Sequence, residues 1–218
     1  MLPTPEELKK RLDPLYSEIL TKIHSEFPDA IIAGGAIRDL YLGRSSNDID
    51  VYINLQDMGY SHYRAKSGII FKRSGVVLNR IDELLGLMVG TIHHTTATED
   101  YQDGLICVAD CDNYKGRKIQ FVFTRLEVEE EVKRFGVHLS MAYFDNVKLH
   151  FTPEFLNDVK NHTLTIPSRI LTDQNEWKRV AVRYLPKMKS YFPNYKIIID
   201  ITDMVESSNE NKSNDIRF

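Results

Sequence analysis

The N-terminal third of the chain carries the clearest pattern of apolar and polar positions. Apolar side chains recur every three to four residues from Leu8 to Ile23, which is the period of one helix face and predicts an amphipathic helix over about 5–26. Thr4, Pro5 and Glu7 match the start of a helix with a capping box. The apolar run 30–33 predicts a short strand, and strict alternation over 48–53 predicts a half-buried one.

The later elements follow from the same two periods. In chain order we expect a helix (79–88), a hairpin (105–110 with 118–124), a helix (126–134), a strand pair (137–143 with 147–151) and two helices (from 152 and over 174–185). Pro186 is expected to break the last helix. Alternation of strands and helices predicts the α+β class, with a mixed sheet flanked by helices and a short helical C-terminal segment.

This pattern divides the 218 residues into three parts. We expect a main domain over 1–151, a helical segment over 152–204 and a tail over 205–218. The tail is rich in Ser, Asn, Glu and Lys, a composition that predicts disorder because it offers little apolar surface to bury. Hydrophobic residues make up 42% of the chain, which is enough for a packed core in the main domain.

Composition narrows the classes of protein. The formal net charge is -3, so any surface for nucleic acid must be local rather than global. Cys107 and Cys111 on one strand would lie about 13 Å apart, too far for a disulfide. No apolar stretch approaches the roughly 20 residues of a membrane span, and the first residues lack the regions of a secretion signal. We therefore expect a cytoplasmic protein that does not contact membranes.

The stretch 30–53 combines two features that suit phosphate chemistry. Gly34 and Gly35 lie between the predicted strand and a short helix over 36–42, where backbone N–H groups can approach an anion. Asp48 and Asp50 are two residues apart on the next strand, so both carboxylates project from one face. Such a pair repels itself unless a divalent cation lies between, and carboxylate oxygens suit Mg²⁺ or Mn²⁺. A phosphate cradle beside a dicarboxylate favours metal-assisted phosphoryl transfer.

The same stretch resembles the nucleotidyltransferase superfamily that includes DNA polymerase beta, and it is most similar to the head domain of CCA-adding enzymes and bacterial poly(A) polymerases. The family pattern is Gly-Gly, two residues, Arg-Asp, two residues, Leu-Gly, four residues, Asp-x-Asp. The chain keeps every spacing, in Gly34-Gly35, Arg38-Asp39, Leu42-Gly43 and Asp48-Ile49-Asp50. The full string is far more specific than a lone Gly-Gly or Asp-x-Asp.

The resemblance implies a role for each matched residue. Gly34 and Gly35 would hold the triphosphate of an NTP, and Arg38 would lie near the phosphates or the strand carboxylates. Asp48 and Asp50 would bind two metal ions, Mg²⁺ or Mn²⁺, and would be the catalytic residues. The alternative for Arg38 and Asp39 is a surface ion pair. By the same resemblance, residues 152–204 occupy the place of the family's neck.

Beyond residue 100 the chain departs from the family. The strand that supplies a third carboxylate matches best at 119–125, where the acid position holds Gln120, which is neither a base nor an anionic ligand. Of the motif that selects the base and binds ribose, Arg134 is kept and Ser140 stands where Asn is usual. His138 is expected either to contact the nucleotide or to be a packed histidine. The choice of base therefore does not carry over.

Two segments combine basic and aromatic residues without any acidic residue. They are 58–81 and 177–199, and both are candidate RNA surfaces because cations neutralise phosphates and aromatic rings stack on bases. The alternative for each is a solvated helix face with aromatic residues in the core.

Three functions remain open at this point. The first is a nucleotidyltransferase that moves a nucleoside monophosphate from an NTP to a hydroxyl, such as an RNA 3′ end like that of tRNA, with release of pyrophosphate. The second is a toxin-like or resistance-type enzyme of the same fold with a protein or small-molecule acceptor. The third is a degenerate module that binds nucleotide or RNA without catalysis, which Gln120 favours and the intact Asp48 and Asp50 disfavour.

Overall fold

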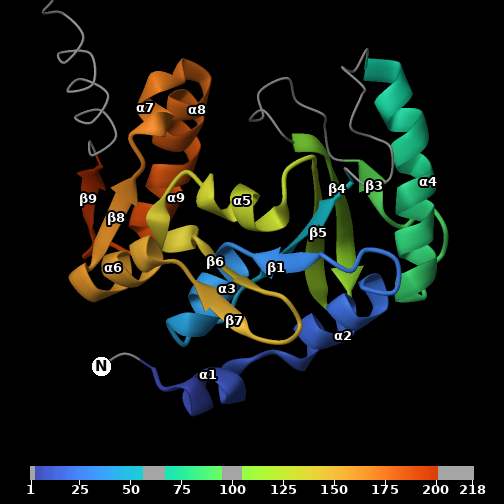
Figure 1. Cartoon of the computed structure of the whole chain (residues 1–218), viewed down its shortest axis with the longest axis horizontal. Helices are drawn as coiled ribbons and strands as arrows, with labels where there is room; N and C mark the ends of the chain where they lie inside the picture. The colour runs from blue at the N-terminus through green and yellow to red at the C-terminus, as the bar shows by residue number, and fades with distance from the viewer. Residues whose placement is uncertain (1–2, 56–66, 95–104, 201–218) are drawn as a thin grey trace, which may run out of the picture. The chain divides into compact units, whose positions relative to one another are not determined.

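The computed structural model describes residues 3–55, 67–94 and 105–200 (Figure 1). The chain forms two compact units. The first comprises the residues up to Phe135 together with Ser140–Thr152, and the second comprises Gly136–Leu139 and the residues from Pro153 onward. The tail predicted over 205–218 and residues 58–66 of the first candidate RNA surface lie outside the described residues.

The first unit is built on one mixed sheet. Its strands are β1 (Ile31–Ala33), β2 (Asp48–Asn54), β3 (His93–His94), β4 (Leu105–Tyr114), β5 (Arg117–Thr124), β6 (Ala142–Phe144) and β7 (Leu149–Phe151). Their spatial order is β3-β4-β5-β2-β1-β6-β7. Only β2 and β5 run parallel, and the other neighbouring pairs are antiparallel. The expected α+β class with a mixed sheet and flanking helices is confirmed.

The two sides of β2 have opposite character. Ile49, Val51 and Ile53 are each 0% exposed, and burying three such side chains stabilises the fold by about 1.5–3 kcal/mol apiece. Asp48 and Asp50 alternate with them and are exposed and half-buried. The alternation predicted from the sequence therefore places both carboxylates on the open side of the sheet.

The N-terminal helix expected over 5–26 is wrong, because the structure has two helices there. They are α1 (Pro5–Arg11) and α2 (Pro14–Ile23). Pro14 has no N–H to donate and disfavours helical backbone at the residue before it. Asp13 instead caps α2 by accepting a hydrogen bond from the Leu15 N–H at 2.9 Å. The capping box of Thr4 and Glu7 is confirmed.

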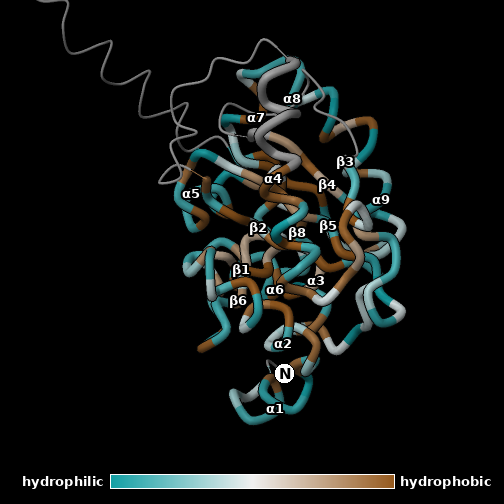
Figure 2. The backbone as a smooth tube through the Cα atoms, turned by 90° about the vertical axis from the view of Figure 1, so that its right-hand side faces the viewer, coloured by the Kyte–Doolittle hydropathy of each residue, from teal (hydrophilic) through white to brown (hydrophobic). Residues whose placement is uncertain are grey.

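The other helices of the first unit are α3 (Gly35–Tyr41), α4 (Ser67–Leu85) and α5 (Val128–Lys133). Helix α4 begins twelve residues before the predicted 79 and ends at Leu85, where Gly86 adopts a positive φ of 72°. Helices α2 and α4 contact each other, and Ile19, Leu20 and Ile23 of α2 are each 0% exposed. Hydrophobic colouring runs along β1, β2 and β5 in Figure 2.

The second unit contains helices and a small sheet. Its elements after residue 152 are α6 (Pro153–Asn161), β8 (Thr163–Ile166), α7 (Arg169–Thr172), α8 (Gln174–Arg179), a π-helical turn (Val180–Tyr184), α9 (Leu185–Tyr191) and β9 (Lys196–Ile199). Strands β8 and β9 pair in parallel. The expectation of helices alone in this segment is wrong, because each strand is short and its partner lies about thirty residues away in the chain.

The predicted end of a helix at Pro186 is also wrong. Pro186 is an early residue of α9, and helical structure continues to Tyr191. The π-helical turn just before it includes a hydrogen bond from the Leu185 N–H to the Val180 carbonyl. A π turn changes the local register, so the missing N–H of Pro186 does not end the helix. Among the described residues, no helix is long and apolar enough to cross a membrane.

Candidate active site

Gly34 makes a turn that only glycine adopts readily. It precedes α3 with φ 76° and ψ -128°, and its N–H donates to the Ala142 carbonyl at 2.9 Å. A Cβ at this position would lie 3.5 Å from the Phe135 ring and 3.8 Å from Oδ2 of Asp50. The turn between β1 and α3 therefore passes directly beside one of the two candidate metal ligands.

Asp48 and Asp50 are held by the register of the central strands. On one side of β2, Asp50 is opposite Ala33, the residue just before the Gly34 turn. On the other side, β5 aligns Asp48 with Lys118 and Asp50 with Gln120. The glycine turn, the two carboxylates and the strand expected to carry the third acid are thus neighbours, as the motif spacing predicted.

Arg38 and Asp39 form a buried ion pair rather than the surface pair considered from the sequence. Arg38 donates from Nε to Oδ1 at 2.8 Å and from Nη2 to Oδ2 at 3.1 Å, and the two side chains are 7% and 12% exposed. The guanidinium also lies near Gly35, where a Cβ would be 3.6 Å from Nη2. A bidentate pair fixes Arg38 in the middle of α3 and compensates its charge.

A third acid does lie near the site, although position 120 is a glutamine. It is Asp110 on β4, which Gln120 contacts. Its Nε2 donates to Oδ1 of Asp110 at 2.9 Å, and the Lys118 ammonium lies 2.5 Å from Oδ2 of the same carboxylate. Asp110 is 3% exposed, so both of its oxygens have partners in a buried position. The acid is one strand further from Asp50 than the family's third carboxylate would be.

Lys118 interacts with Asp110 and Asp112 of β4 on one side and with Asp48 of β2 on the other. Hydrogen bonding to Asp110 raises its pKa, and the charges of Asp112 and Asp48 add to the effect. Asp112, which is exposed, lies 3.7 Å from the Lys118 ammonium and 3.8 Å from Nε2 of His93. The sequence analysis did not single out Lys118, although its place two residues before Gln120 on an alternating strand was a usable signal.

Arg134 and Phe135 follow α5, which contacts β2. Arg134 caps that helix with its backbone N–H, and the Phe135 ring lies 5.4 Å from the ring of Tyr52 and against Gly34. Arg134 is therefore in the same unit as the glycines and carboxylates. Phe135 is an aromatic wall of the site that the sequence analysis did not name.

His138 belongs to the second unit. It is 8% exposed, and burial lowers its pKa despite the nearby charges of Asp158 and Asp200. A buried, uncharged histidine fits the packed alternative considered from the sequence. Its role toward a nucleotide stays a prediction.

The donor set beside Gly34 fits a divalent cation only in part. Asp48 and Asp50 offer hard oxygen ligands on one open face, which suits Mg²⁺ or Mn²⁺. The Gln120 amide nitrogen donates a hydrogen bond to Asp110, and its carbonyl oxygen carries no charge. Gln120 therefore adds no anionic ligand for the ion. Within the described residues, no three His, Cys, Asp or Glu side chains gather as a metal-binding group. The pair therefore suits an ion that takes its other ligands from water and substrate phosphates.

The two basic segments differ in how their described cations are paired. In 58–81 the side chain of Arg80 is described, and it pairs with Glu26 and Glu83. In 177–199 the side chains of Lys178, Arg183 and Lys187 are exposed. Lys189 from that segment instead donates to the carbonyls of Pro193 and Tyr195. The second segment therefore keeps a set of solvent-facing cations.

Comparison with known families gives one match. The model of the Gabija anti-defense 2 family matches residues 6–162, which is most of the chain and includes every candidate residue of the site. No functionally curated protein matches the sequence.

Solved structures add a likeness of fold. A CCA-adding enzyme in complex with CTP has 18% identity and a TM-score of 0.55, covering 95% of this chain and 47% of that one. The complex of a CCA-adding enzyme with ATP has 17% identity and a TM-score of 0.54, covering 95% of this chain and 44% of that one. A tRNA-processing enzyme in its apo form I has 15% identity and a TM-score of 0.53, covering 90% of this chain and 45% of that one. The chain thus spans less than half the length of these proteins, and it shares a nucleotidyltransferase-like fold with them.

Proposed function

The chain belongs to the Gabija anti-defense 2 family, and we propose that it is a metal-dependent nucleotidyltransferase. It would transfer a nucleoside monophosphate from an NTP to a hydroxyl acceptor such as an RNA 3′ end. The new bond joins the acceptor oxygen to the α-phosphorus, and the bond to the β-phosphate breaks, so pyrophosphate leaves. Solved relatives of the fold bind ATP or CTP, which supports an NTP as substrate.

One observation carries the proposal: Gly34, in its positive-φ turn, lies so close to Asp50 that a Cβ on it would be 3.8 Å from Oδ2 of that carboxylate. The Gly34 N–H is bound to the Ala142 carbonyl, so the first N–H groups of α3, which have no acceptor within the helix, would meet the triphosphate beside Asp48 and Asp50. A divalent ion bound there would neutralise the triphosphate and activate the attacking hydroxyl. The chain's own part is to bind and orient both reactants, with Gly35 facing the phosphates and Arg38 fixing the turn.

The division of labour between the parts of the chain is part of this proposal. Residues 1–151 would form the nucleotidyltransferase head, and residues 152–204 would stand where the family carries its neck. The exposed cations Lys178, Arg183 and Lys187 in the second part would bind the RNA phosphates. Arg134 would contact the nucleotide.

A second candidate is a module that binds nucleotide or RNA without chemistry. Gln120 favours it, because the acid that replaces the missing carboxylate, Asp110, is buried and bound to Lys118. A third candidate keeps the chemistry but takes a protein or small molecule as acceptor, and the anti-defense description of the family is compatible with it.

The test is to incubate the intact protein and Mg²⁺ with each of the four NTPs labelled at the α-phosphate. Total RNA and a cell lysate freed of nucleic acid serve as separate acceptors. Label on RNA with release of pyrophosphate supports the main proposal, and label on protein supports the third candidate. Saturable NTP binding with no transfer to either acceptor contradicts both and supports the binding module.

A further inference from the structure

The ammonium of Lys118 lies among the acidic side chains on the open face of the sheet. Lys118 is opposite Asp48 of β2. Two residues further along β5, Gln120 is opposite Asp50 on one side and Asp110 on the other. Paired residues on neighbouring strands share a face, and so do residues two apart on one strand. One lysine and three carboxylates from three adjacent strands therefore project from the same side of the sheet.

The ammonium is already engaged by the carboxylates of β4. Its Nζ lies 2.5 Å from Oδ2 of Asp110 and 3.7 Å from Oδ1 of Asp112. The other oxygen of Asp110, Oδ1, accepts a hydrogen bond from Nε2 of Gln120 at 2.9 Å. Asp110 is 3% exposed, and a buried carboxylate that loses its cation is left uncompensated. Asp110 is therefore not available to a metal ion while Lys118 holds it.

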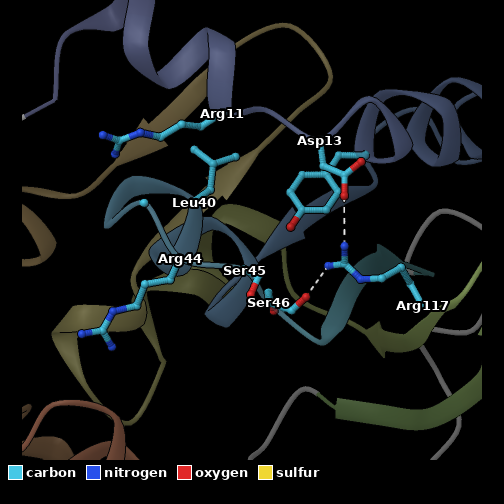
Figure 3. A pocket seen from close by; sticks show the side chains of 9 residues that line it. Arg11, Asp13, Leu40, Arg44, Ser45, Ser46 and Arg117 are labelled. Atoms are coloured by element: carbon cyan, nitrogen blue, oxygen red, sulfur yellow. Dashed lines mark hydrogen bonds and ion pairs between the residues drawn. The ribbon is translucent and has the colours of Figure 1, made fainter.

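The position of Lys118 beside Asp48 is fixed by the residue before it. Arg117 pairs with Asp13 at 3.1 Å and donates to the carbonyl of Ser46, and Figure 3 shows both contacts. Ser46 in turn donates from Oγ to the Asp48 carbonyl at 2.8 Å. The loop that enters β2 and the first residue of β5 are thus bound to each other. The parallel pair of β2 and β5 begins at this junction, which keeps Lys118 and Asp48 side by side.

The side of Asp48 that faces β5 is unfavourable for a second divalent ion. Position 120 offers a neutral amide there, and Asp110 is bound to Lys118. Neighbouring strands lie about 4.8 Å apart, so an ion bound between Asp48 and β5 would lie close to the ammonium and be repelled by it. Lys118 therefore supplies the positive charge that the acids on this side need.

We propose that the Lys118 ammonium takes the place of a second metal ion, so that the site holds one divalent ion, on Asp48 and Asp50, instead of two. The inference rests on the proposed function and changes the number of ions that the family resemblance implies. An ammonium is a compact charge with three donors, so it compensates the acids as an ion would. It cannot accept a lone pair from the acceptor hydroxyl, so activation of that hydroxyl stays with the divalent ion.

The test is to count the Mn²⁺ ions that the intact protein binds without nucleotide, from the electron paramagnetic resonance signal of the free ion. Wild type should bind one. Lys118→Met should bind one more, because Asp48, Asp110 and Asp112 lose the cation beside them and offer hard oxygen ligands instead. Adding Asp110→Asn to Lys118→Met removes one of these ligands and should return the count to one.

Two further variants serve as controls. Lys118→Arg keeps the charge among the acids and should bind one ion, like wild type. Lys115→Met removes the same charge from the exposed turn between β4 and β5, where Lys115 pairs with Glu18 at 2.6 Å, and should also bind one ion. A lysine that only supported the fold would lose metal binding on substitution, so the gain of an ion is not a folding effect.

Any number other than one in wild type, no additional ion in Lys118→Met, or an additional ion in Lys118→Arg or Lys115→Met would each overturn the proposal. So would an additional ion that persists in the double variant, because it would then lie away from Asp110. These counts need neither NTP nor acceptor. The proposed function fails instead if none of the four labelled NTPs is transferred, whatever the number of ions.

Discussion

At the scale of single residues, the two glycines of the motif have different tasks. Gly34 adopts a φ of 76° and ψ of -128°, which a side chain would strain, whereas Gly35 has room for a Cβ at 3.6 Å from Arg38. Gly34→Ala should lower the free energy of unfolding by about 1–3 kcal/mol. Gly35→Ala should leave stability unchanged but raise the Kd for NTP at least about tenfold, because the methyl group would lie against the Arg38 guanidinium and crowd the approach of phosphate to the start of α3.

Urea unfolding and NTP calorimetry on the two variants separate these tasks. A Gly34→Ala protein as stable as the wild type would contradict the strain argument. An unchanged NTP affinity in Gly35→Ala would remove Gly35 from the phosphate site.

Gln120 gives a second prediction at this scale. If the site lacks its usual base because Gln120 replaces an acid, Gln120→Asp should raise turnover. General-base help is worth roughly 10²–10⁴-fold, and we expect at least about tenfold because the new carboxylate also meets Asp110. Gln120→Asn keeps the neutral amide and is the matched control.

Steady-state turnover over a range of pH measures the effect. No gain of Gln120→Asp over Gln120→Asn, together with loss of activity in Asp110→Asn, would assign the base to Asp110 and contradict the prediction.

Much of the candidate site could be predicted because its residues are close in sequence. Spacing alone placed Gly34, Gly35, Asp48 and Asp50 on a turn and a neighbouring strand. The contact between Gln120 and Asp110 could not be predicted, because it depends on the register of β4 against β5. The burial of the Arg38–Asp39 ion pair could not be predicted either, because it depends on residues distant in sequence that pack against α3.

At the scale of elements, β2, β4 and β5 were predicted well and the helix ends less well. The strand expected over 137–143 is wrong, because the structure has a 3-10 turn at His138–Ser140 and only the short β6 after it. Alternation in β2 and the turn between β4 and β5 are local signals. Pro14 and Pro186 show why helix ends are harder: the first divides two helices, and the second lies inside a helical stretch next to a π turn. A proline forbids one hydrogen bond, and the surrounding turns decide whether the helix ends.

Asp158 on α6 tests how the second unit is held together. It is 0% exposed, and its carboxylate accepts hydrogen bonds from the Thr163 hydroxyl at 2.6 Å and the Thr165 N–H at 2.9 Å. Asp158→Asn places amide donors against these donors and should lower the free energy of unfolding by about 1.5–3 kcal/mol. Asn157→Ala on the exposed side of α6 should change it by less than about 0.5 kcal/mol. Equal stability of the two variants in urea would contradict this account of the α6–β8 connection.

At the scale of the whole molecule, a net charge of -3 means that RNA binding would depend on local cations. A triple Ala variant of Lys178, Arg183 and Lys187 should bind RNA more weakly. Its slope of log K against log salt should fall by roughly two, since each contact with single-stranded RNA contributes about 0.7. Filter binding at several salt concentrations measures both quantities.

The matched control for that variant is the triple Ala variant of Lys9, Lys10 and Lys133, which are exposed on helices of the first unit and remove the same charge. Equal losses in the two triple variants would show that only net charge matters and would contradict an RNA surface on 177–199.

The central claim is that Asp48 and Asp50 are the catalytic metal ligands of a nucleotidyltransferase. The most direct measurement is Mg²⁺-dependent pyrophosphate release by wild type, Asp48→Asn and Asp50→Asn, with exposed Asp112 on the same sheet changed to Asn as control. We predict a fall of at least about 100-fold in the first two variants at unchanged stability, and activity within about threefold of wild type in the control. Near wild-type release by either Asp48→Asn or Asp50→Asn would contradict the claim.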